Sequence, residues 1–449
     1  MAEAMRVSAG KRGAASGHRR PQRRQLAVSS EVMEVTVTRI GAQGDGIADG
    51  DRGRLYIPLT VPGDRLRVRA LSRHGDGFAA ELIQVLDPGP GRSAPPCPHF
   101  GHCGGCSLQH LTAEAYRRWL LDRLTEPLAR VGLADAAIAP LLQTQPRSRR
   151  RATFSALRPG AAAGAIVGFQ VSRGHAIVDL SDCHVLVPAM MPLLPALRSL
   201  FAGILLPRQR IDVAVTAADT GLDVVVGWPA SPDLALRETL ASFAENADLA
   251  RLSVLVGDGP VEPIVGRRGV GVRFGRTVVS LPAGGFLQAS REGEAALVAA
   301  IRAAAEGRRS AADLFAGAGA FTFPLAEAGI RVHAVDADRA AIAALTAAAG
   351  GLPQVNAEVR DLFARPLRAD ELNCFEMVIF DPPRAGARAQ AEQLAGSKVT
   401  VVVAVSCNPQ TFARDARILV DGGYRLDSVT PVDQFLWSAH LELVAVFRR

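Results

Sequence analysis

Four cysteines in this sequence of 449 residues have a spacing that is typical of metal centres. Cys97, Cys103 and Cys106 are separated by five and two residues, and Cys183 follows after 76 intervening residues. Structural zinc usually has roughly two to four residues between paired ligands, whereas three clustered cysteines with a remote fourth commonly hold an iron-sulfur cluster. The spacing therefore favours a 4Fe-4S cluster over zinc. The alternative is a set of unconnected buried thiols, which fits Cys183 better than the clustered three.

Two apolar segments end in side chains that can act chemically. The segment MVIFDPPRAG places Asp381 directly before two prolines, which end a strand and stiffen the loop that follows. The segment VTVVVAVSCNP places Cys407 at the end of a second apolar strand. Ligands of open α/β sheets bind at this carboxyl edge, so a thiol there can act as a nucleophile. Polar neighbours distinguish Cys407 from Cys374, which we interpret as a buried small hydrophobic residue.

A glycine-rich turn predicts a site for an adenosine-containing ligand. In DLFAGAGAFTFPLA, Asp313 ends a strand, Gly317 and Gly319 form a tight turn, and a helix follows. The strand RVHAVD ends 23 residues beyond Asp313 in Asp336, an acid that can accept hydrogen bonds from ribose hydroxyls. The turn lacks the third glycine of NAD sites and the GKS/T of ATP sites, which leaves S-adenosylmethionine as the favoured ligand. A plain strand-to-helix turn is the alternative.

The C-terminal part of the chain, residues 285–449, is expected to position the strand-end groups. Helical patterns of 10 to 18 residues alternate there with short apolar strands. This alternation predicts a Rossmann-like domain, in which a parallel sheet carries helices on both faces. The expected strands are 311–315, 331–335, 376–380 and 399–406.

Two further domains are expected before this one. Residues 92–284 contain strand-like runs between Pro and Gly turns and a helical stripe at 112–132, which indicates a central α+β domain. Residues 31–91 show short alternating strands that end in a run of breakers, which predicts a small barrel of the oligonucleotide-binding kind. One strand of that barrel has a face of arginines. These arginines are as well explained by an ordinary solvated surface as by RNA binding. The fold class is therefore multi-domain α/β.

The net charge of +7 comes mainly from the first 30 residues, which hold seven basic side chains and one acidic. The remainder has 51 − 7 = 44 basic and 44 − 1 = 43 acidic residues, a balance of +1. We interpret residues 1–30 as a disordered solubilising tail, with a tether for RNA or DNA as the alternative. The sequence has neither a long apolar stretch nor a secretory signal pattern, so we expect a cytosolic protein without membrane contact.

Six separated motifs resemble one family. CPHFGHCGGC with Cys183, GGFLQAS, DLFAGAGAF, FDPPRAG, VSCNPQTFARD and HLELVAVF occur in the order found in the S-adenosylmethionine-dependent RNA uracil-5-methyltransferases. The resemblance extends from about residue 32 to the end. Residues 31–91 resemble the TRAM module, an RNA-binding barrel. Together with the cysteines, this resembles the 23S ribosomal RNA branch more than the transfer RNA branch, so RNA is the expected partner and no obligate protein partner is evident.

The resemblance also implies roles for single residues. Cys407 would be the nucleophile and Glu442 the base. It further implies that the helix at 112–132 packs on the catalytic domain. The residues implied to contact S-adenosylmethionine are Gln288, Phe315, Asp336, Asp361 and Asp381, and those implied to bind the 4Fe-4S cluster are Cys97, Cys103, Cys106 and Cys183.

Four positions depart from the family pattern. The family usually has Cys at the position of Ala316 and Asn at that of Ser290. It has Pro and Thr at those of Leu436 and Ser438, just before Glu442. None of these departures removes a catalytic group, although the last two alter the loop that leads to Glu442.

The expected chemistry requires both catalytic side chains. C5 of uracil is a weak nucleophile, so a thiolate must first add to C6, and a carboxylate must later remove the C5 proton before the thiol can leave. An RNA cytosine-5-methyltransferase is a less favoured alternative, because its second cysteine is replaced here by the Asp381 motif. A non-catalytic iron-sulfur RNA-binding protein is the other, and the presence of Cys407 and Glu442 argues against it.

Overall fold

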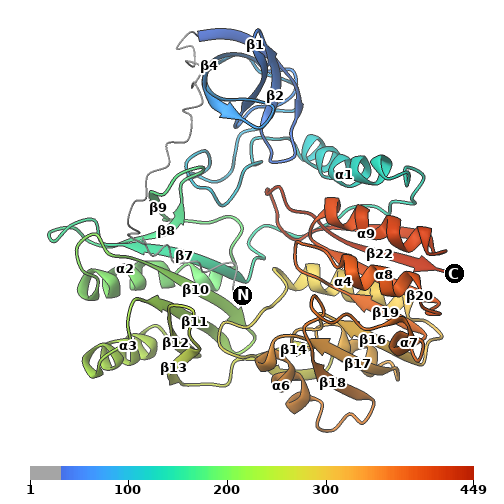
Figure 1. Cartoon of the computed structure of the whole chain (residues 1–449). Helices are drawn as coiled ribbons and strands as arrows, with labels where there is room; N and C mark the ends of the chain where they lie inside the picture. The colour runs from blue at the N-terminus through green and yellow to red at the C-terminus, as the bar shows by residue number, and fades with distance from the viewer. Residues whose placement is uncertain (1–31) are drawn as a thin grey trace, which may run out of the picture. The chain divides into compact units, whose positions relative to one another are not determined.

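The computed structural model describes residues 32–449 (Figure 1). The predicted basic tail, residues 1–30, lies outside the described residues. Contacts between Cα atoms divide the chain into two compact units. One comprises the chain up to Pro96 together with Cys106–Tyr116, and the other comprises Cys97–Gly105 and Arg117–Arg449. The expected catalytic domain and most of the expected central domain fall in the second unit, whereas residues 92–96 and 106–116 of the central domain fall in the first. The boundary between the two expected domains stays a prediction.

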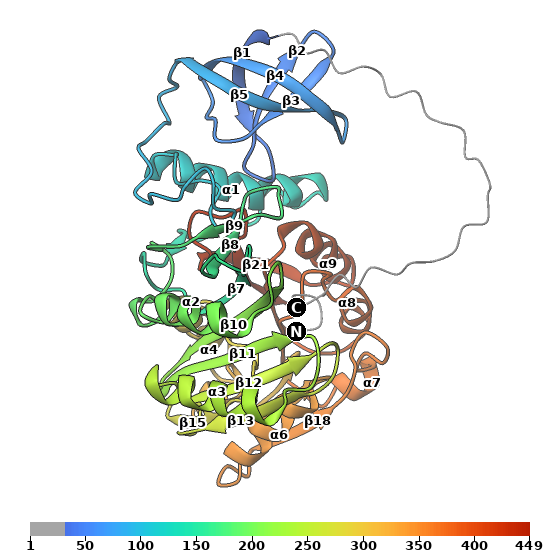
Figure 2. The ribbon, with the colours of Figure 1, turned by 90° about the vertical axis from the view of Figure 1, so that its left-hand side faces the viewer.

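The first unit contains the predicted small barrel, whose strands close in the order β1-β2-β3-β5-β4 (Figure 2). Alternation places Val35, Val37, Leu66 and Val68 inside the barrel, where they are buried. The strands are β1 (Val32–Ile40), β2 (Gly46–Gly50), β3 (Gly53–Ile57), β4 (Arg65–His74) and β5 (Gly77–Asp87).

The arginine face of the barrel lies on β4 and is balanced by carboxylates. Arg65 Nε donates to Asp87 at 2.6 Å, and Arg67 Nε donates to Glu34 at 3.3 Å. Both arginines are about half exposed, so these ion pairs contribute little stability.

The first sheet of the second unit has seven strands in the order β13-β12-β11-β10-β7-β8-β9. Only β11 and β12 are parallel, and the other pairs are antiparallel. The strands are β7 (Arg151–Leu157), β8 (Ile166–Gln170), β9 (Ile177–Asp179), β10 (Arg210–Ala218), β11 (Gly221–Trp228), β12 (Arg251–Val256) and β13 (Val261–Gly266).

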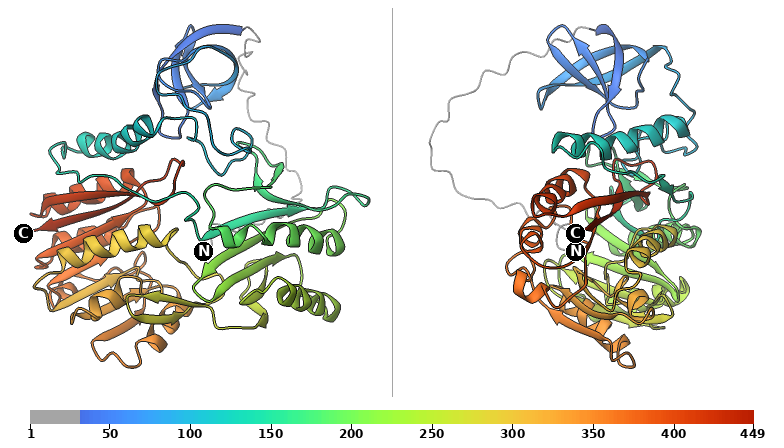
Figure 3. Two further views of the ribbon diagram at one scale, coloured as in Figure 1. Left: turned by 180° about the vertical axis from the view of Figure 1, so that it is seen from behind. Right: turned by 90° about the vertical axis from the view of Figure 1, so that its right-hand side faces the viewer.

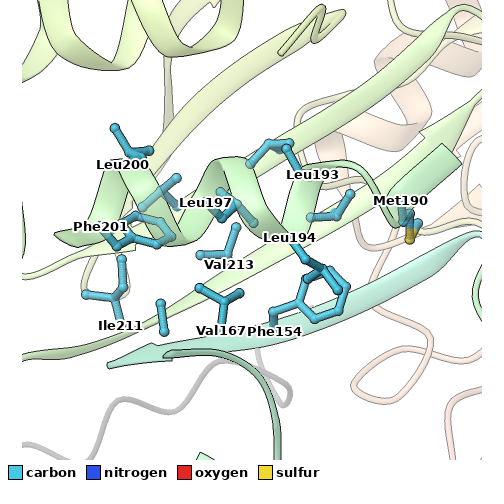
Figure 4. Close-up of a cluster of buried hydrophobic side chains, with 14 of the residues drawn as sticks. Phe154, Val167, Met190, Leu193, Leu194, Leu197, Leu200, Phe201, Ile211 and Val213 are labelled. Carbon is cyan, nitrogen blue, oxygen red and sulfur yellow. The ribbon is translucent and has the colours of Figure 1, made fainter. Parts of the chain in front are cut away.

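Two helices, α2 (Leu193–Ile204) and α3 (Leu234–Asn246), accompany this sheet. Leu194, Leu197 and Phe201 recur along one side of α2 and are buried in the same cluster as Phe154 and Val213 of the sheet (Figure 4). The arrangement is α+β, as the sequence predicts for this region.

The second sheet has eight strands in the order β18-β17-β16-β19-β20-β22-β21-β6 (Figure 3). Its first five strands are parallel, as predicted, and β22 and β21 are antiparallel additions. The strands are β16 (Ser310–Leu314), β17 (Arg331–Asp336), β18 (Val355–Val359), β19 (Met377–Phe380), β20 (Val401–Ser406), β21 (Arg425–Asp433), β22 (Glu442–Arg448) and β6 (Leu142–Gln143).

Helices bury both faces of this sheet. Val401, Val403 and Val405 of β20 share a core with residues of α4, while the intervening Val402 is also buried, on the opposite face. The helices of this part are α4 (Arg291–Ala304), α5 (Thr322–Ala326), α6 (Arg339–Ala348), α7 (Ala369–Leu372), α8 (Arg388–Ala395) and α9 (Pro409–Asp421). No helix within residues 32–449 is both long and apolar enough to cross a membrane.

Two segments outside residues 285–449 pair with the eight-stranded sheet or lead into it. Strand β6 pairs with β21, with Leu142 opposite Val432 and Gln143 opposite Asp433. A hairpin, β14 (Gly271–Phe274) with β15 (Thr277–Ser280), leads into it. Helix α1 (Ala113–Arg130) covers most of the predicted 112–132 stripe. The eight-stranded sheet therefore includes a strand, β6, from the region that the sequence assigns to the central domain.

Candidate active site

The strand order creates a ligand site at one edge of the eight-stranded sheet. Strand β16 has β17 on one side and β19 on the other, so the strand order reverses there, and ligands bind beyond the carboxyl ends of strands at such a switch point. Asp313 is buried near the end of β16, Asp381 directly follows β19, and Cys407 directly follows β20. The sheet thus brings together three residues that the sequence predicts at strand ends.

Glu442 reaches this edge from the other direction. It is the first residue of β22, which runs antiparallel to β20 with Leu443 opposite Ser406. The next residues of the ladder are Glu442 and Cys407, and the carboxyl group of Glu442 acts electrostatically on the thiol. On its other side Glu442 lies opposite Val432 of β21, so two strands hold it in the sheet.

The thiol of Cys407 is neutral in the resting protein. Burial, reinforced by the carboxyl groups of Glu442 and Asp381, raises its pKa to about 12. Arg384 acts in the opposite direction but does not compensate. Because the thiolate is the reactive form of cysteine, any nucleophilic role of this thiol requires that it first lose its proton.

The carboxyl groups of Asp313, Asp381 and Glu442 are buried as well. Burial raises the pKa of Asp313 to about 7, although a hydrogen bond from the hydroxyl of Thr322 at 2.6 Å lowers it. Burial and repulsion between neighbouring carboxylates raise the pKa values of Asp381 and Glu442 well above their usual range. Acids of this kind can hold or release a proton near neutral pH, as general acid-base chemistry requires.

The glycine turn and the acid of β17 form the predicted adenosine site. The backbone N–H of Gly317 donates to Asp336 Oδ2 at 2.8 Å, so the acid is held against the turn. Gly317 has φ +54°, and a methyl group added there would meet no atom within 4 Å. Open space at a left-handed glycine leaves room for a ligand to approach the backbone. The residues therefore fit an adenosine-containing cofactor.

Two phenylalanines accompany this turn. Phe315 has φ +62°, and its ring centroid lies 5.5 Å from that of Phe363. Asp361 orders the second phenylalanine, because its Oδ1 accepts hydrogen bonds from the backbone N–H groups of Phe363 and Ala364 at 2.9 and 3.2 Å. Phe363 is not among the residues predicted from the sequence, although an apolar residue just after a predicted ligand acid is a usable signal.

Gln288 connects to the strand ends through its amide, whose Nε2 donates to Asp381 Oδ2 at 3.1 Å. Two arginines hold the segment that carries it: Arg150 donates to the carbonyl of Gln288 and Arg151 to that of Leu287, each at 3.0 Å. Arg150 is buried and pairs with Glu294 at 2.6 Å. These neighbouring cations thus position the site instead of forming a solvated surface.

His440, two residues before Glu442, is held neutral. Burial and the nearby guanidinium groups of Arg384, Arg123 and Arg149 lower its pKa to about 4. Arg384 contacts its ring nitrogens, and Phe435 meets the ring edge-on with centroids 5.9 Å apart. Through Arg123, helix α1 acts on this part of the site.

Three of the four predicted cluster cysteines lie in the second unit. The backbone of Cys103 forms an isolated antiparallel β-bridge with Val171, which directly follows β8. The sulfur of Cys103 accepts a hydrogen bond from Gly105 N–H at 3.4 Å. Burial, together with the neighbouring thiols of Cys97 and Cys183, raises the pKa of Cys103. Cys106 belongs to the other unit.

These contacts do not amount to a formed metal site. Among residues 32–449, no group of three or more His, Cys, Asp or Glu side chains is arranged to hold a metal ion. The three thiols fit a shared ligand in type and neighbourhood, but the predicted cluster remains a hypothesis. The interpretation of Cys374 is wrong: this residue is exposed, and its thiol donates to the carbonyl of Glu371 at the end of the short helix α7.

The sheet, the glycine turn and the strand-end thiol define a Rossmann-like methyltransferase. Residues 282–449 match the family model described as tRNA (Uracil-5-)-methyltransferase. A Caulobacter vibrioides protein described as an "Uncharacterized RNA methyltransferase" is 43% identical, over 93% of this chain and 100% of the relative. The 23S rRNA (uracil(1939)-C(5))-methyltransferase RlmD of Alkalilimnicola ehrlichii is 32% identical, over 95% of this chain and 99% of its own.

The chain belongs to the family of S-adenosylmethionine-dependent RNA uracil-5-methyltransferases. The fold agrees with this assignment. The crystal structure of Pyrococcus abyssi tRNA (uracil-54, C5)-methyltransferase in complex with S-adenosyl-L-homocysteine superposes with a TM-score of 0.71. The match covers 92% of this chain and 100% of the other at 22% identity.

Proposed function

We propose that this enzyme methylates C5 of one uridine in 23S ribosomal RNA through a covalent bond between Cys407 and C6. The observation that carries the mechanism is the pairing of a strand-end thiol with a buried carboxyl group on the adjacent strand. The ribosomal target is supported by the full-length similarity to a 23S rRNA enzyme. Transfer RNA is the second candidate, since the matching family model is named for it. The cytosolic location stays a prediction.

In the proposed mechanism, Cys407 and Glu442 act in sequence. The thiol of Cys407 gives its proton to solvent water, its sulfur bonds to C6 of the uracil, and the C5–C6 double-bond electrons move towards O4, which makes C5 nucleophilic. S-adenosylmethionine, when bound, supplies the methyl group. Glu442 then takes the proton from C5, the C5–C6 double bond re-forms, and the C6–S bond breaks to release Cys407.

The remaining predicted residues are proposed to hold the cofactor. Asp336 and the turn at Gly317 would receive the ribose, and the rings of Phe315 and Phe363 would lie against the adenine. Asp361 would support this region through the backbone of Phe363. Gln288 and Asp381, which hydrogen-bond to each other, would lie at the reacting end of the site. The departure at Ser290 has a structural role, since its hydroxyl caps helix α4 by accepting from Gly293 N–H at 3.0 Å.

The catalytic assignment is tested by replacing each member of the pair. Cys407→Ala is expected to abolish both methylation and the covalent adduct. Glu442→Gln keeps the side-chain shape but cannot accept the C5 proton, so it is expected to add, methylate and then stall. The measurement is a denaturing gel of enzyme, RNA and cofactor with a labelled methyl group, in which Glu442→Gln alone accumulates a labelled protein-RNA species. Loss of a positioned base typically slows a reaction by ~10²- to 10⁴-fold.

His440 is the neighbour that would replace Glu442 as the base, and its low pKa makes it a weak one. Normal turnover by Glu442→Gln would therefore show that Glu442 is not the base. The RNA target is read from the same reactions: 5-methyluridine mapped in ribosomal RNA supports the proposal, and 5-methyluridine in transfer RNA alone would replace the proposed substrate. Label in 5-methylcytidine would overturn the uracil assignment.

We also propose that Cys97, Cys103, Cys106 and Cys183 hold a 4Fe-4S cluster that supports the fold and RNA docking. The protein purified without oxygen is expected to be brown and to contain about four iron atoms per chain. Cys183→Ser should lose the iron, whereas Cys374→Ser, at an exposed cysteine outside the set, should keep it. A colourless protein with one zinc atom per chain would contradict the proposal.

A further inference from the structure

A buried glutamine outside the predicted site residues contacts the proposed base. Gln434 directly follows strand β21 and is 2% exposed. Its Nε2 donates to Glu442 Oε2 and to Gln288 Oε1, each at 2.9 Å. Gln288 in turn donates to Asp381. A chain of side-chain amides therefore connects the carboxyl group of Asp381 to that of Glu442.

The orientation of the Gln434 side-chain amide follows from the two atoms to which it donates. A carboxylate oxygen can only accept a hydrogen bond, and so can the carbonyl oxygen of Gln288. Both therefore require the N–H₂ side of the Gln434 amide. Turning that amide around would place oxygen against oxygen in a buried site, where unpaired polar atoms are costly.

The two oxygens of Glu442 differ in consequence. Oε2 accepts from Gln434, while Oε1 is buried and has no hydrogen-bond partner within the described part of the chain. We propose that Gln434 is a positioning residue that locks Oε2 and leaves Oε1 as the oxygen that takes the C5 proton. This inference rests on the proposed function of Glu442 as the base.

The hydrogen bond also acts on the charge of the base. Burial and the carboxyl group of Asp381 raise the pKa of Glu442, and the bond from Gln434 lowers it. The other titratable group facing Glu442 is the thiol of Cys407, whose own pKa the carboxyl group raises. Gln434 therefore keeps more of Glu442 in the ionised form that can accept a proton.

Helix α4 provides the space for this glutamine. A methyl group added to Gly293, in the first turn of α4, would lie 2.7 Å from Gln434 Cβ, 2.8 Å from its Oε1 and 2.8 Å from Oγ of the capping Ser290. Contacts this short do not occur, so any side chain at position 293 would displace the amide. Gly293 thus offers a way to disturb Gln434 without altering it.

The test compares two changes at buried glutamines. Gln434→Leu keeps the approximate volume but removes the donor to Glu442. Gln390→Leu is the matched control, because Gln390 is 1% exposed and bonds to the backbone of Leu367 at 2.9 and 3.0 Å, outside the proposed site. Single-turnover reactions with RNA and labelled S-adenosylmethionine measure adduct formation and RNA release separately.

Gln434→Leu is expected to slow RNA release by roughly 10- to 100-fold at pH 7, the scale of a hydrogen bond to a charged group, while adduct formation changes much less. Because the lost bond had lowered the pKa of Glu442, release should recover as the pH rises from 7 to 9. Gly293→Ala is also expected to slow RNA release more than adduct formation, and its RNA release should also recover as the pH rises from 7 to 9. Gln390→Leu should release RNA at the wild-type rate relative to adduct formation.

Two outcomes separate this inference from the proposed function. If Glu442→Gln stalls but Gln434→Leu releases RNA at the wild-type rate, Gln434 does not position the base, whereas slowing that persists at pH 9 would show that Gln434 acts on the geometry of Glu442 and not on its pKa. If Glu442→Gln turns over normally, both the base assignment and the role of Gln434 fail.

Discussion

At the scale of single residues, the buried carboxyl groups of this enzyme make its stability depend on pH. Asp313 is fully buried, and its Oδ1 has no hydrogen-bond partner among residues 32–449. Its pKa of about 7 means that the folded state binds a proton that the unfolded state releases near pH 4. The associated stability is complete below pH 4 and is lost as the pH rises through 7. The folded state thus becomes less stable relative to the unfolded state towards alkaline pH.

Replacement of this acid by its neutral analogue tests that conclusion. Asp313→Asn can still accept the hydrogen bond from Thr322 but cannot ionise, so the variant should gain stability at pH 8.5 and little at pH 5. The difference between the two gains should be on the order of 2–4 kcal/mol, because one pKa unit corresponds to about 1.4 kcal/mol. Thermal midpoints of the cofactor-free protein at both pH values measure it. Asp258→Asn, the same change at an exposed position, should show no such difference, and an equal response of both variants would contradict the argument.

At the scale of elements, the loop between β16 and α5 packs against buried side chains and is proposed to bind the cofactor, and two of its glycines divide these tasks. Both have positive φ, +54° at Gly317 and +96° at Gly319. A methyl group at Gly319 would lie 2.7 Å from a ring carbon of the buried Phe323 and 3.1 Å from Leu345. At Gly317 the same methyl group would enter open space.

We therefore expect different defects from the same substitution. Gly319→Ala should lower the thermal midpoint strongly, because the clash adds to the strain of a left-handed alanine. Gly317→Ala should cost only about 1–2 kcal/mol of strain but should weaken S-adenosylmethionine binding, because the methyl group occupies the proposed ribose approach. Thermal denaturation and calorimetric titration with the cofactor measure the two effects. Equal losses of stability with unchanged cofactor affinity would contradict this division.

At the scale of the whole molecule, positive charge is unevenly distributed along the chain. The seven cations of residues 1–30 account for most of the net charge, and this segment lies outside the described residues. In the barrel, by contrast, the arginines of β4 have carboxylate neighbours. If either segment contacts RNA phosphates, the affinity for RNA will depend more steeply on salt concentration.

Deletion of residues 1–30 measures the contribution of the tail. We expect the slope of log affinity against log salt to stay unchanged, as for a solubilising arm. Each tail cation that contacts a phosphate would instead flatten the slope by about 0.7 to 0.9 on deletion. Replacement of Arg65 and Arg67 by Gln in the same assay tests the barrel separately. A flatter slope for the deletion alone would make the tail an RNA tether.

Much of the architecture could be predicted from the sequence. Alternating patterns predicted the barrel and the parallel sheet, because periodicity reports which side of an element is buried. Strand ends followed by unusual residues located Asp381 and Cys407, because parallel strands expose their carboxyl ends at one edge. The 4Fe-4S cluster, the domain boundary near residue 284 and the individual roles of the site residues stay predictions.

Only the tertiary structure decided which distant groups meet. Cys407 and Glu442 are neighbours because β22 pairs with β20 in one register, and a shift by one residue would turn Glu442 to the other face. Gln434 escaped the sequence analysis because its two acceptors, Glu442 and Gln288, lie 8 and 146 residues away along the chain. Local patterns determine the elements and the residues at their ends, whereas contacts between remote segments depend on register and packing, which no local pattern specifies.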